Sequence, residues 1–171
     1  MLRHSKQDLV DKILEQWGKE RPDLDVAPMG IIGRISRVER LVDEQMKAVC
    51  ASFNLERWGF DVLASLRRAG KPYRLTPTQL YSSLMLTSGA MTNRVDRLQA
   101  AGLVKRLHDP ADRRGVLVSL TRDGRKLIDK AVTAHMEVEE TMLASFSFKD
   151  REKFAGLLRT LSQDLEDGLD R

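Results

Sequence analysis

The sequence predicts a mainly α-helical fold with a small β-hairpin wing, that is, a winged helix-turn-helix set between flanking helices. Three observations lead to this prediction: two capped helical segments joined by a tight turn, a pair of short apolar strands directly after them, and long amphipathic stretches on both sides. The chain has 171 residues, 42% of them hydrophobic and 32% charged, which is typical of a folded protein with a real core.

The helix-turn-helix is predicted from two sets of capping residues. At Thr76-Pro77-Thr78-Gln79 a hydroxyl can cap free backbone N–H groups, proline suits the first helical position, and Gln79 can complete a capping box. Ser88-Gly89 opens a second helix, which should run to about Ala101 and stop at Gly102, a residue that readily adopts the left-handed conformation. Two helices joined by so short a turn form the pattern that many DNA-binding proteins use.

The hairpin follows directly. Residues 103–107 and 116–120 alternate in the manner of short strands, and the polar segment 109–115 between them is typical of a turn. We expect this hairpin to be the wing, with Arg113 and Arg114 near its tip.

The second helix of the motif has the two faces that a reading helix needs. On a helical wheel Met91, Val95 and Leu98 fall within about 60° of arc and define a buried side. Small and polar residues occupy the other side, where their donors can reach bases or phosphates. An ordinary amphipathic helix with a solvated polar face is the alternative. The predicted DNA contacts are Ser88, Thr92, Asn93 and Arg97 of this helix, and Arg113 and Arg114 of the wing.

Positive charge is concentrated on the same part of the chain. Residues 61–115 hold ten Lys and Arg against four Asp and no Glu, a net charge of +6. The remaining residues hold nineteen basic and twenty-one acidic side chains, a net charge of −2. This distribution favours double-stranded DNA as a partner, and it predicts phosphate contacts from some of the cluster Arg67, Arg68, Lys71 and Arg74.

The organisation we expect is one structural unit with three parts. Residues 1–52 form an extra N-terminal helix, opened by a capping box from Ser5 to Asp8, and a first dimerisation helix over about 28–51. Residues 53–120 form the DNA-binding lobe, and 121–171 the C-terminal dimerisation helices. Their apolar stripes would usually be internal core, but their surplus favours a homodimer that places two reading helices about one DNA turn apart on a palindromic site.

Other functional classes find little support in the sequence. Cys50 is the only cysteine, and His4, His108 and His135 are scattered, so neither a disulfide framework nor a metal site can be assembled from spacing. No nucleophile motif or phosphate loop appears, and we expect neither catalysis nor a bound cofactor. No apolar run approaches the roughly 20 residues that span a bilayer, and no signal peptide is apparent, so we expect a cytoplasmic protein.

Residues 60–80, 86–107 and 109–128 closely resemble the MarR family of bacterial transcriptional regulators. The most specific features are the wing sequence Asp112-Arg113-Arg114 and the Leu-Thr-x-x-Gly pattern that ends at Gly124. The resemblance covers about residues 28–165. It implies a MarR-like dimer with winged helix-turn-helix lobes hung from a helical dimerisation region, usually a repressor released by a small ligand.

The added N-terminal helix, which ends in WGKERPDLD, resembles the urate-responsive, PecS/HucR-like branch of that family. In this branch the ligand pocket is attributed to a tryptophan of the added helix, an aspartate of the helix before the motif, and two arginines. The resemblance therefore implies Trp17, Asp61, Arg94 and Arg106 as ligand-binding residues.

The chemistry of these residues suits urate, a flat purine anion, because a pocket for it needs a cation, a hydrogen-bonding carboxylate and an aromatic wall. Arg94 lies about 60° from Met91 on the wheel, at the seam between the buried and exposed faces, so a ligand that pairs with it can shift the reading helix. Three alternatives remain: a structural ion pair of Asp61 with an arginine, a Trp17 that covers the dimer core, and a phenolic or aromatic carboxylate as the ligand. A ligand-independent DNA-binding protein and a helical interaction module are the other functional classes.

Overall fold

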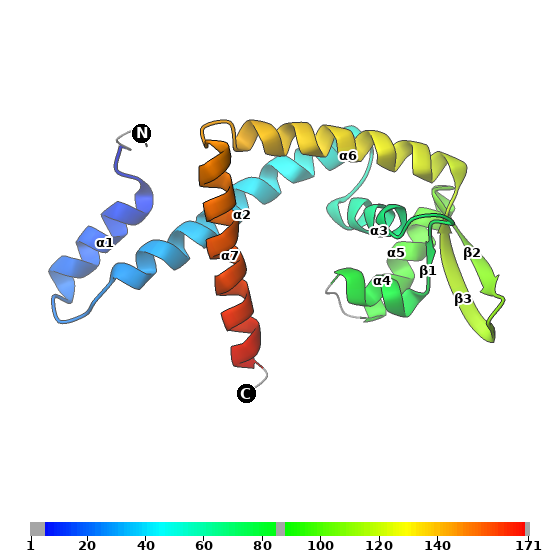
Figure 1. Cartoon of the computed structure of the whole chain (residues 1–171), viewed down its shortest axis with the longest axis horizontal. Coiled ribbons are helices and arrows are strands. Elements are labelled where there is room, and N and C mark those ends of the chain that lie inside the picture. Colours follow the sequence, from blue (N-terminus) through cyan, green and yellow to red (C-terminus); the bar gives the residue numbers. More distant parts are fainter. Residues whose placement is uncertain (1–5, 85–87, 170–171) are drawn as a thin grey trace. The chain divides into compact units, whose positions relative to one another are not determined.

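A computed structural model describes residues 6–84 and 88–169. The chain divides into two compact units, Met1–Ala48 and Val49–Arg171. The first unit contains α1 (Leu9–Glu20) and most of α2 (Ala27–Ser52), which crosses the boundary (Figure 1). The second unit contains, in chain order, α3 (Arg57–Arg68), β1 (Arg74–Leu75), α4 (Pro77–Leu84), α5 (Ser88–Ala100), β2 (Val104–Asp109), β3 (Asp112–Leu120), α6 (Arg122–Met142) and α7 (Phe148–Leu169). The mainly helical fold with a small hairpin is thereby confirmed.

The start of α1 differs from the predicted one. Asp8 is the N-cap, and it forms a capping box with Asp11: the Asp11 N–H donates to Asp8 Oδ1 at 2.9 Å, and the Asp8 N–H donates to Asp11 Oδ2 at 2.8 Å. The prediction that Ser5 opens this helix falls on a residue outside the described ranges. Asp8 is therefore the first residue of the box rather than the last, because its carboxylate can accept an N–H bond as well as a hydroxyl can.

Within the first unit α1 is attached to α2 by an arginine and by close packing. The guanidinium of Arg34 donates to Asp8 Oδ2 at 3.0 Å and to Asp11 Oδ1 at 2.6 Å. A Cβ at Gly30 would lie 3.2 Å from Leu14 Cδ1, so this glycine lets the two helices approach. The capping carboxylates of α1 thus also fasten it to α2.

Most of the apolar stripe on α2 lies on the surface. Ile31 is 63% exposed, Ile32 54% and Val38 50%. Met46, in contrast, is completely buried. Most of this stripe is therefore not internal core in a single chain.

The core of the second unit is centred on α3. Its residues Val62, Leu63 and Leu66 have no exposed surface. They pack with buried side chains from every neighbouring element, and this places the motif helices, the sheet and α6 around one helix. The other members of this core include Leu80 of α4, Met91, Val95 and Leu98 of α5, Val104, Val118 and Leu120 of the sheet, and Ile128 and Ala131 of α6.

The helix-turn-helix has the caps that the sequence predicts. The backbone N–H of Gln79 donates to Thr76 Oγ1 at 3.1 Å, and the N–H of Thr76 donates to Gln79 Oε1 at 2.9 Å, which completes the capping box of α4. α5 ends at Ala100, and Gly102 has a φ of 71°, in the left-handed region that favours glycine. The predicted start of α4 is confirmed, and the predicted end of α5, at about Ala101, is confirmed to within one residue.

The three strands form an antiparallel sheet in the order β1-β3-β2. β2 and β3 are longer than predicted: Asp109 pairs with Asp112, so only Pro110 and Ala111 remain between the strands, and Arg113 and Arg114 lie within β3. The predicted turn over 109–115 is thus too long, because exposed polar residues can pair through the backbone. The hairpin extends beyond α4 and α5 of the same unit (Figure 1).

The base of the hairpin is fixed to the start of α6. Thr121 is the N-cap of α6, since its Oγ1 accepts the Gly124 N–H at 2.9 Å, and it also donates to the carbonyl of Gly102 at 2.8 Å. A Cβ at Gly124 would lie 1.9 Å from the Leu103 carbonyl oxygen. The Leu-Thr-x-x-Gly pattern therefore has two structural purposes, a cap and a close backbone approach.

α7 begins after a capping pair, Ser147 and Asp150, and leaves its apolar side exposed. The Asp150 N–H donates to Ser147 Oγ at 3.2 Å, and the Ser147 hydroxyl donates to Asp150 Oδ2 at 2.7 Å. None of the described residues of α7 is buried. Its large exposed side chains include Phe148, Phe154, Leu157, Leu158 and Leu165.

Candidate functional site

The reading helix α5 has the two faces predicted for it. Met91, Val95 and Leu98 are between 2% and 3% exposed, so they anchor one side in the core. The side chains of Thr92, Asn93, Asp96 and Arg97 are exposed on the other side. Ser88 lies in the first turn of α5. The wheel therefore identified the buried side correctly, and the opposite side is open to a partner.

Arg97, a predicted DNA contact, is held by the start of α3. Its Nη2 lies 2.5 Å from Oε1 of Glu56, the N-cap residue of α3. Its guanidinium carbon lies 4.8 Å from the centre of the Trp58 ring, and the indole N–H of Trp58 also donates to Glu56. Both hydrogen bonds lower the pKa of Glu56, and the bond from Trp58 has the larger effect, followed by the bond from Arg97. Arg97 thus has an intramolecular carboxylate partner.

Arg94 lies at the edge between the buried and the exposed sides of α5. It is half-buried, and its Nη1 is buried with no hydrogen-bond partner among the described residues. Its guanidinium carbon lies 5.8 Å from the centre of the same Trp58 ring. Trp58 is therefore in contact with both arginines of α5, at a distance where a cation and a ring attract.

Asp61, on α3, is the acidic group of this region. Arg57 Nε lies 3.7 Å from Asp61 Oδ1, and the carboxylate is half-buried. Burial raises the pKa of Asp61 above its ordinary value, and nearby positive charges act in the opposite direction. These charges are those of Arg57, His135, Arg68 and Arg94.

His135 of α6 closes this region from the core side. It is 6% exposed, and its ring stacks on that of Phe60 with a centroid distance of 4.7 Å. Its Nε2 lies 2.9 Å from Glu139 Oε1, and its Nδ1 is buried without a partner in the described part of the chain. The scattered histidines of the sequence gave no indication of this position.

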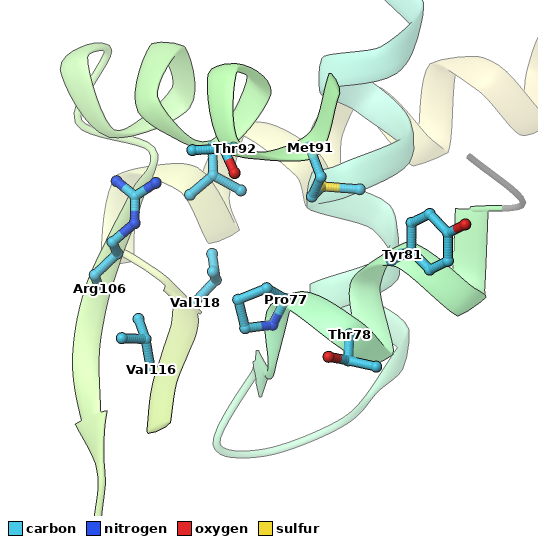
Figure 2. Close-up of a pocket in the computed structure, with 9 residues that line it drawn as sticks. Pro77, Thr78, Tyr81, Met91, Thr92, Arg106, Val116 and Val118 are labelled. Carbon is cyan, nitrogen blue, oxygen red and sulfur yellow. The ribbon is translucent and has the colours of Figure 1, made fainter. Parts of the chain in front are cut away.

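Arg106 has different neighbours. Its Nη2 lies 2.7 Å from Asp96 Oδ1, and its Nη1 donates to Gln99 Oε1 at 2.9 Å. It lines a groove of about 530 Å³ between α4, α5 and the wing (Figure 2). The groove walls are mostly apolar, from Pro77, Tyr81, Met91, Val95, Val116 and Val118, with Thr78, Thr92 and Arg106 as polar lining residues.

The four ligand residues that the resemblance implies are thus distributed over several places. Asp61 and Arg94 belong to the cluster at Trp58, whereas the hydrogen-bond partners of Arg106 lie on the exposed side of α5. Trp17 belongs to the first unit, where it is 42% exposed on α1. The residues that sequence reasoning missed are Glu56, Arg57 and His135. Arg57, four residues before Asp61, and His135, four residues before Glu139, had a spacing that predicts a pair.

Two arginines of the predicted basic cluster have structural partners. Arg67 Nε donates to Asp129 Oδ1 of α6 at 2.6 Å, and Arg68 Nη2 donates to the Ser83 carbonyl at 3.0 Å. Lys71, which precedes β1, and Arg74, its first residue, are exposed. Arg67 and Arg68 therefore connect elements of the fold, and Lys71 and Arg74 are the freer candidates for phosphate.

Residues 6–84 and 88–169 contain neither a candidate metal cluster nor a candidate membrane-spanning helix. They hold no group of three or more His, Cys, Asp or Glu side chains that is suited to a metal ion. No helix within these ranges is both long enough and apolar enough to cross a bilayer.

A reading helix anchored on one side, together with a two-stranded wing, defines a winged helix-turn-helix protein. Residues 53–115 match the model of the MarR family. The chain is 40% identical over 156 residues to the HTH-type transcriptional regulator PecS of Dickeya dadantii, which covers 91% of this chain and 94% of that protein. The chain therefore belongs to the MarR family of transcriptional regulators.

Solved structures agree with this assignment. A mutant MarR of Escherichia coli in complex with operator DNA superposes with a TM-score of 0.68 at 26% identity, over 91% of this chain and 99% of that one. BpsR of Bordetella bronchiseptica, described in a structure on its regulation by 6-hydroxynicotinic acid, superposes with a TM-score of 0.61 at 26% identity, over 75% and 98% of the two chains.

Proposed function

We propose that this protein is a cytoplasmic, homodimeric repressor that binds a palindromic operator and is released by a small planar anion such as urate. The observation that carries the DNA-binding part is α5, with one side buried to 3% exposure or less and the other side open next to the wing. In this proposal Ser88, Thr92, Asn93 and Arg97 contact the major groove, and Arg113 and Arg114 contact the backbone or minor groove. The operator-bound E. coli MarR structure supports this assignment.

A second copy of the chain is the proposed occupant of the open apolar faces. α2 exposes Ile31, Ile32 and Val38, and α7 leaves Phe148 at 77% and Leu157 at 61% exposure. Apolar surface on this scale is rare on a monomeric protein, whereas a two-fold dimer buries it. Dimerisation would also provide the two reading helices that a palindrome requires.

The proposed ligand-binding residues are Trp17 of the first unit, and Asp61, Arg94 and Arg106 of the second. Support from the described contacts is strongest for Asp61 and Arg94, which lie in one half-buried cluster at the inner edge of the reading helix. An anion that pairs with Arg94 competes with the present neighbours of this arginine and displaces α5. DNA affinity then falls because the ligand binds the displaced form more tightly.

An aromatic carboxylate is the second candidate ligand. The groove at Arg106 favours it, since the walls are apolar and a single guanidinium lies beside Thr92 on the lining. The BpsR comparison, with an aromatic acid as effector of that protein, also supports this class. In this case Arg106 would exchange its bond to Asp96 for one to the ligand.

The test is fluorescence anisotropy of a labelled duplex taken from the DNA upstream of the protein's own gene, at one fixed salt concentration. Protein is added to saturation, followed by urate or salicylate. Release by urate alone supports the purine anion, and release by salicylate alone supports the aromatic carboxylate. Tight binding that neither anion changes would leave a ligand-independent DNA-binding protein. Sedimentation equilibrium on the same sample tests the dimer.

A further inference from the structure

Buried polar atoms that lack a hydrogen-bond partner are concentrated at one place in the second unit. In the described part of the chain, four buried side-chain atoms have no hydrogen-bond partner. Three of them belong to residues near Asp61: Arg57 Nη1 and Arg94 Nη1, which are donors, and the ring nitrogen His135 Nδ1. Buried polar atoms without partners are uncommon in folded proteins, so this cluster requires an explanation.

Asp61 does not supply the missing acceptor. Its Oδ1 lies 3.7 Å from Arg57 Nε, which is close enough for an ion pair but too long for a hydrogen bond. The Nη1 atoms of Arg57 and Arg94 both remain unpaired. The charges of Arg57 and Arg94 therefore act on the Asp61 carboxylate, while the Nη1 atoms of both arginines remain available for hydrogen bonds.

The charge balance shows which kind of acceptor is missing. Arg57, Arg68 and Arg94 all act on the Asp61 carboxylate. Arg94 also acts on Glu56, but Glu56 is paired with Arg97, and Glu139 is paired with His135. The cluster thus has an excess of positive charge in a half-buried place. An anion with several oxygen or nitrogen acceptors would satisfy both the charge and the two guanidinium groups.

The surroundings also favour a flat anion. The Trp58 ring lies 5.8 Å from the Arg94 guanidinium, and the rings of Phe60 and His135 stack with an interplanar angle of 12°. Planar groups bind well between guanidinium planes and aromatic rings.

We propose that Arg57 is a ligand-binding residue, and that Arg57 and Arg94 together hold the anionic edge of the effector beside Asp61. This proposal rests on the proposed function, and it adds a residue of α3 to the site. Because Arg57 is in the first turn of α3 and Arg94 is on α5, the bound anion bridges the core helix and the reading helix. Arg106, whose donors already have Asp96 and Gln99 as acceptors, is not the partner of Arg94 in this bridge.

The test measures anion binding directly, in the full chain without DNA. Isothermal titration calorimetry with sodium urate, and separately with sodium salicylate, is carried out on the wild-type protein, Arg57→Gln and Arg57→Lys. The matched control is Arg67→Gln, which removes an arginine from the same helix and breaks its ion pair with Asp129. Circular dichroism and thermal unfolding establish that each variant is folded.

Loss of a charged hydrogen-bond donor should weaken the binding of the effective anion about tenfold to a hundredfold in Arg57→Gln. Arg57→Lys should recover part of this loss, and Arg67→Gln should bind like the wild type. Wild-type affinity in a folded Arg57→Gln variant would overturn the proposal while leaving the proposed function intact. A wild-type protein that binds neither anion would overturn both.

Discussion

Glu56 and Arg97 form an ion pair that joins the N-cap of α3 to the exposed side of α5, with Oε1 and Nη2 2.5 Å apart. The Glu56 carboxylate thus binds the same Arg97 guanidinium group that is expected to contact DNA. Glu56→Gln removes the charge of this competitor, so we expect DNA affinity to rise several-fold. Anisotropy titrations over a series of salt concentrations should also show a steeper slope, by about one phosphate contact. Weaker binding by Glu56→Gln would instead show that the pair holds Arg97 in position for DNA.

Asn93 gives a cleaner test of base reading than Arg97. A substitution of Arg97 also removes its contacts with the Glu56 carboxylate and the Trp58 ring. Asn93→Ala should weaken binding to the specific duplex by about 1 to 3 kcal/mol if the amide contacts a base edge. Binding to an unrelated duplex and binding of the anion should remain unchanged. An equal loss on both duplexes would place Asn93 on phosphate. The same experiment on Arg97→Ala should give a loss in the same range.

Arg113 lies in β3, one residue after the start of the strand. As a phosphate contact, it should contribute equally on all sequences. Arg113→Ala is therefore expected to lower affinity for specific and unrelated duplexes alike, and to reduce the salt slope by about one. A selective loss on the specific duplex would mean that the wing reads sequence.

Asp61 provides a pH-dependent prediction. Burial raises the pKa of Asp61 in the folded protein. Proton binding to Asp61 therefore stabilises the fold at low pH. This stabilisation is lost as the pH rises through the pKa that Asp61 has in the folded state. Asp61→Asn imitates the protonated carboxyl, so its melting temperature near pH 7 should equal or exceed that of the wild type. The difference should disappear at a pH below the ordinary range of aspartate. The variant should bind DNA normally and respond less to the anion, whereas a dimer that unfolds would establish a structural ion pair.

Gly124 offers a stability test in the fold itself. A Cβ at this position would lie 1.9 Å from the carbonyl oxygen of Leu103, which is backbone and cannot rotate away. Gly124→Ala should therefore destabilise the protein by about 1 to 3 kcal/mol, as overpacked sites do. Gly156→Ala in α7, where a Cβ meets nothing within 4 Å, is the control and should be neutral or slightly stabilising. Urea unfolding of both variants measures the difference.

The parts of the fold that the sequence predicts well are those set by local chemistry. The capping box at Thr76 and Gln79 and the cap at Thr121 depend on groups three residues apart, so the sequence contains all that they need. The buried side of α5 was equally readable from periodicity. The two-residue strand β1, in contrast, pairs with residues far along the chain, Arg74 with Ser119 and Leu75 with Val118. No local pattern in the sequence predicts this strand.

The candidate site was less predictable, because the neighbours of a long charged side chain are decided by tertiary structure. Arg94 and Arg106 are both arginines near the reading helix, and only the fold gives Arg106 the partners Asp96 and Gln99 and leaves an Arg94 nitrogen without one. What covers the apolar stripe on α2 could not be predicted for a related reason. The period of the stripe shows which side of the helix is apolar, but it does not distinguish burial within one chain from burial against another.

The junction at Thr121 and Gly124 has a mechanical consequence. The Thr121 side chain holds the Gly102 carbonyl, and Gly124 lies against the backbone of Leu103, so the hairpin has no joint where it meets α6. We therefore expect the hairpin and the first turns of α6 to move as one rigid piece. A small rotation of α6 would then produce a larger displacement at the far end of the hairpin.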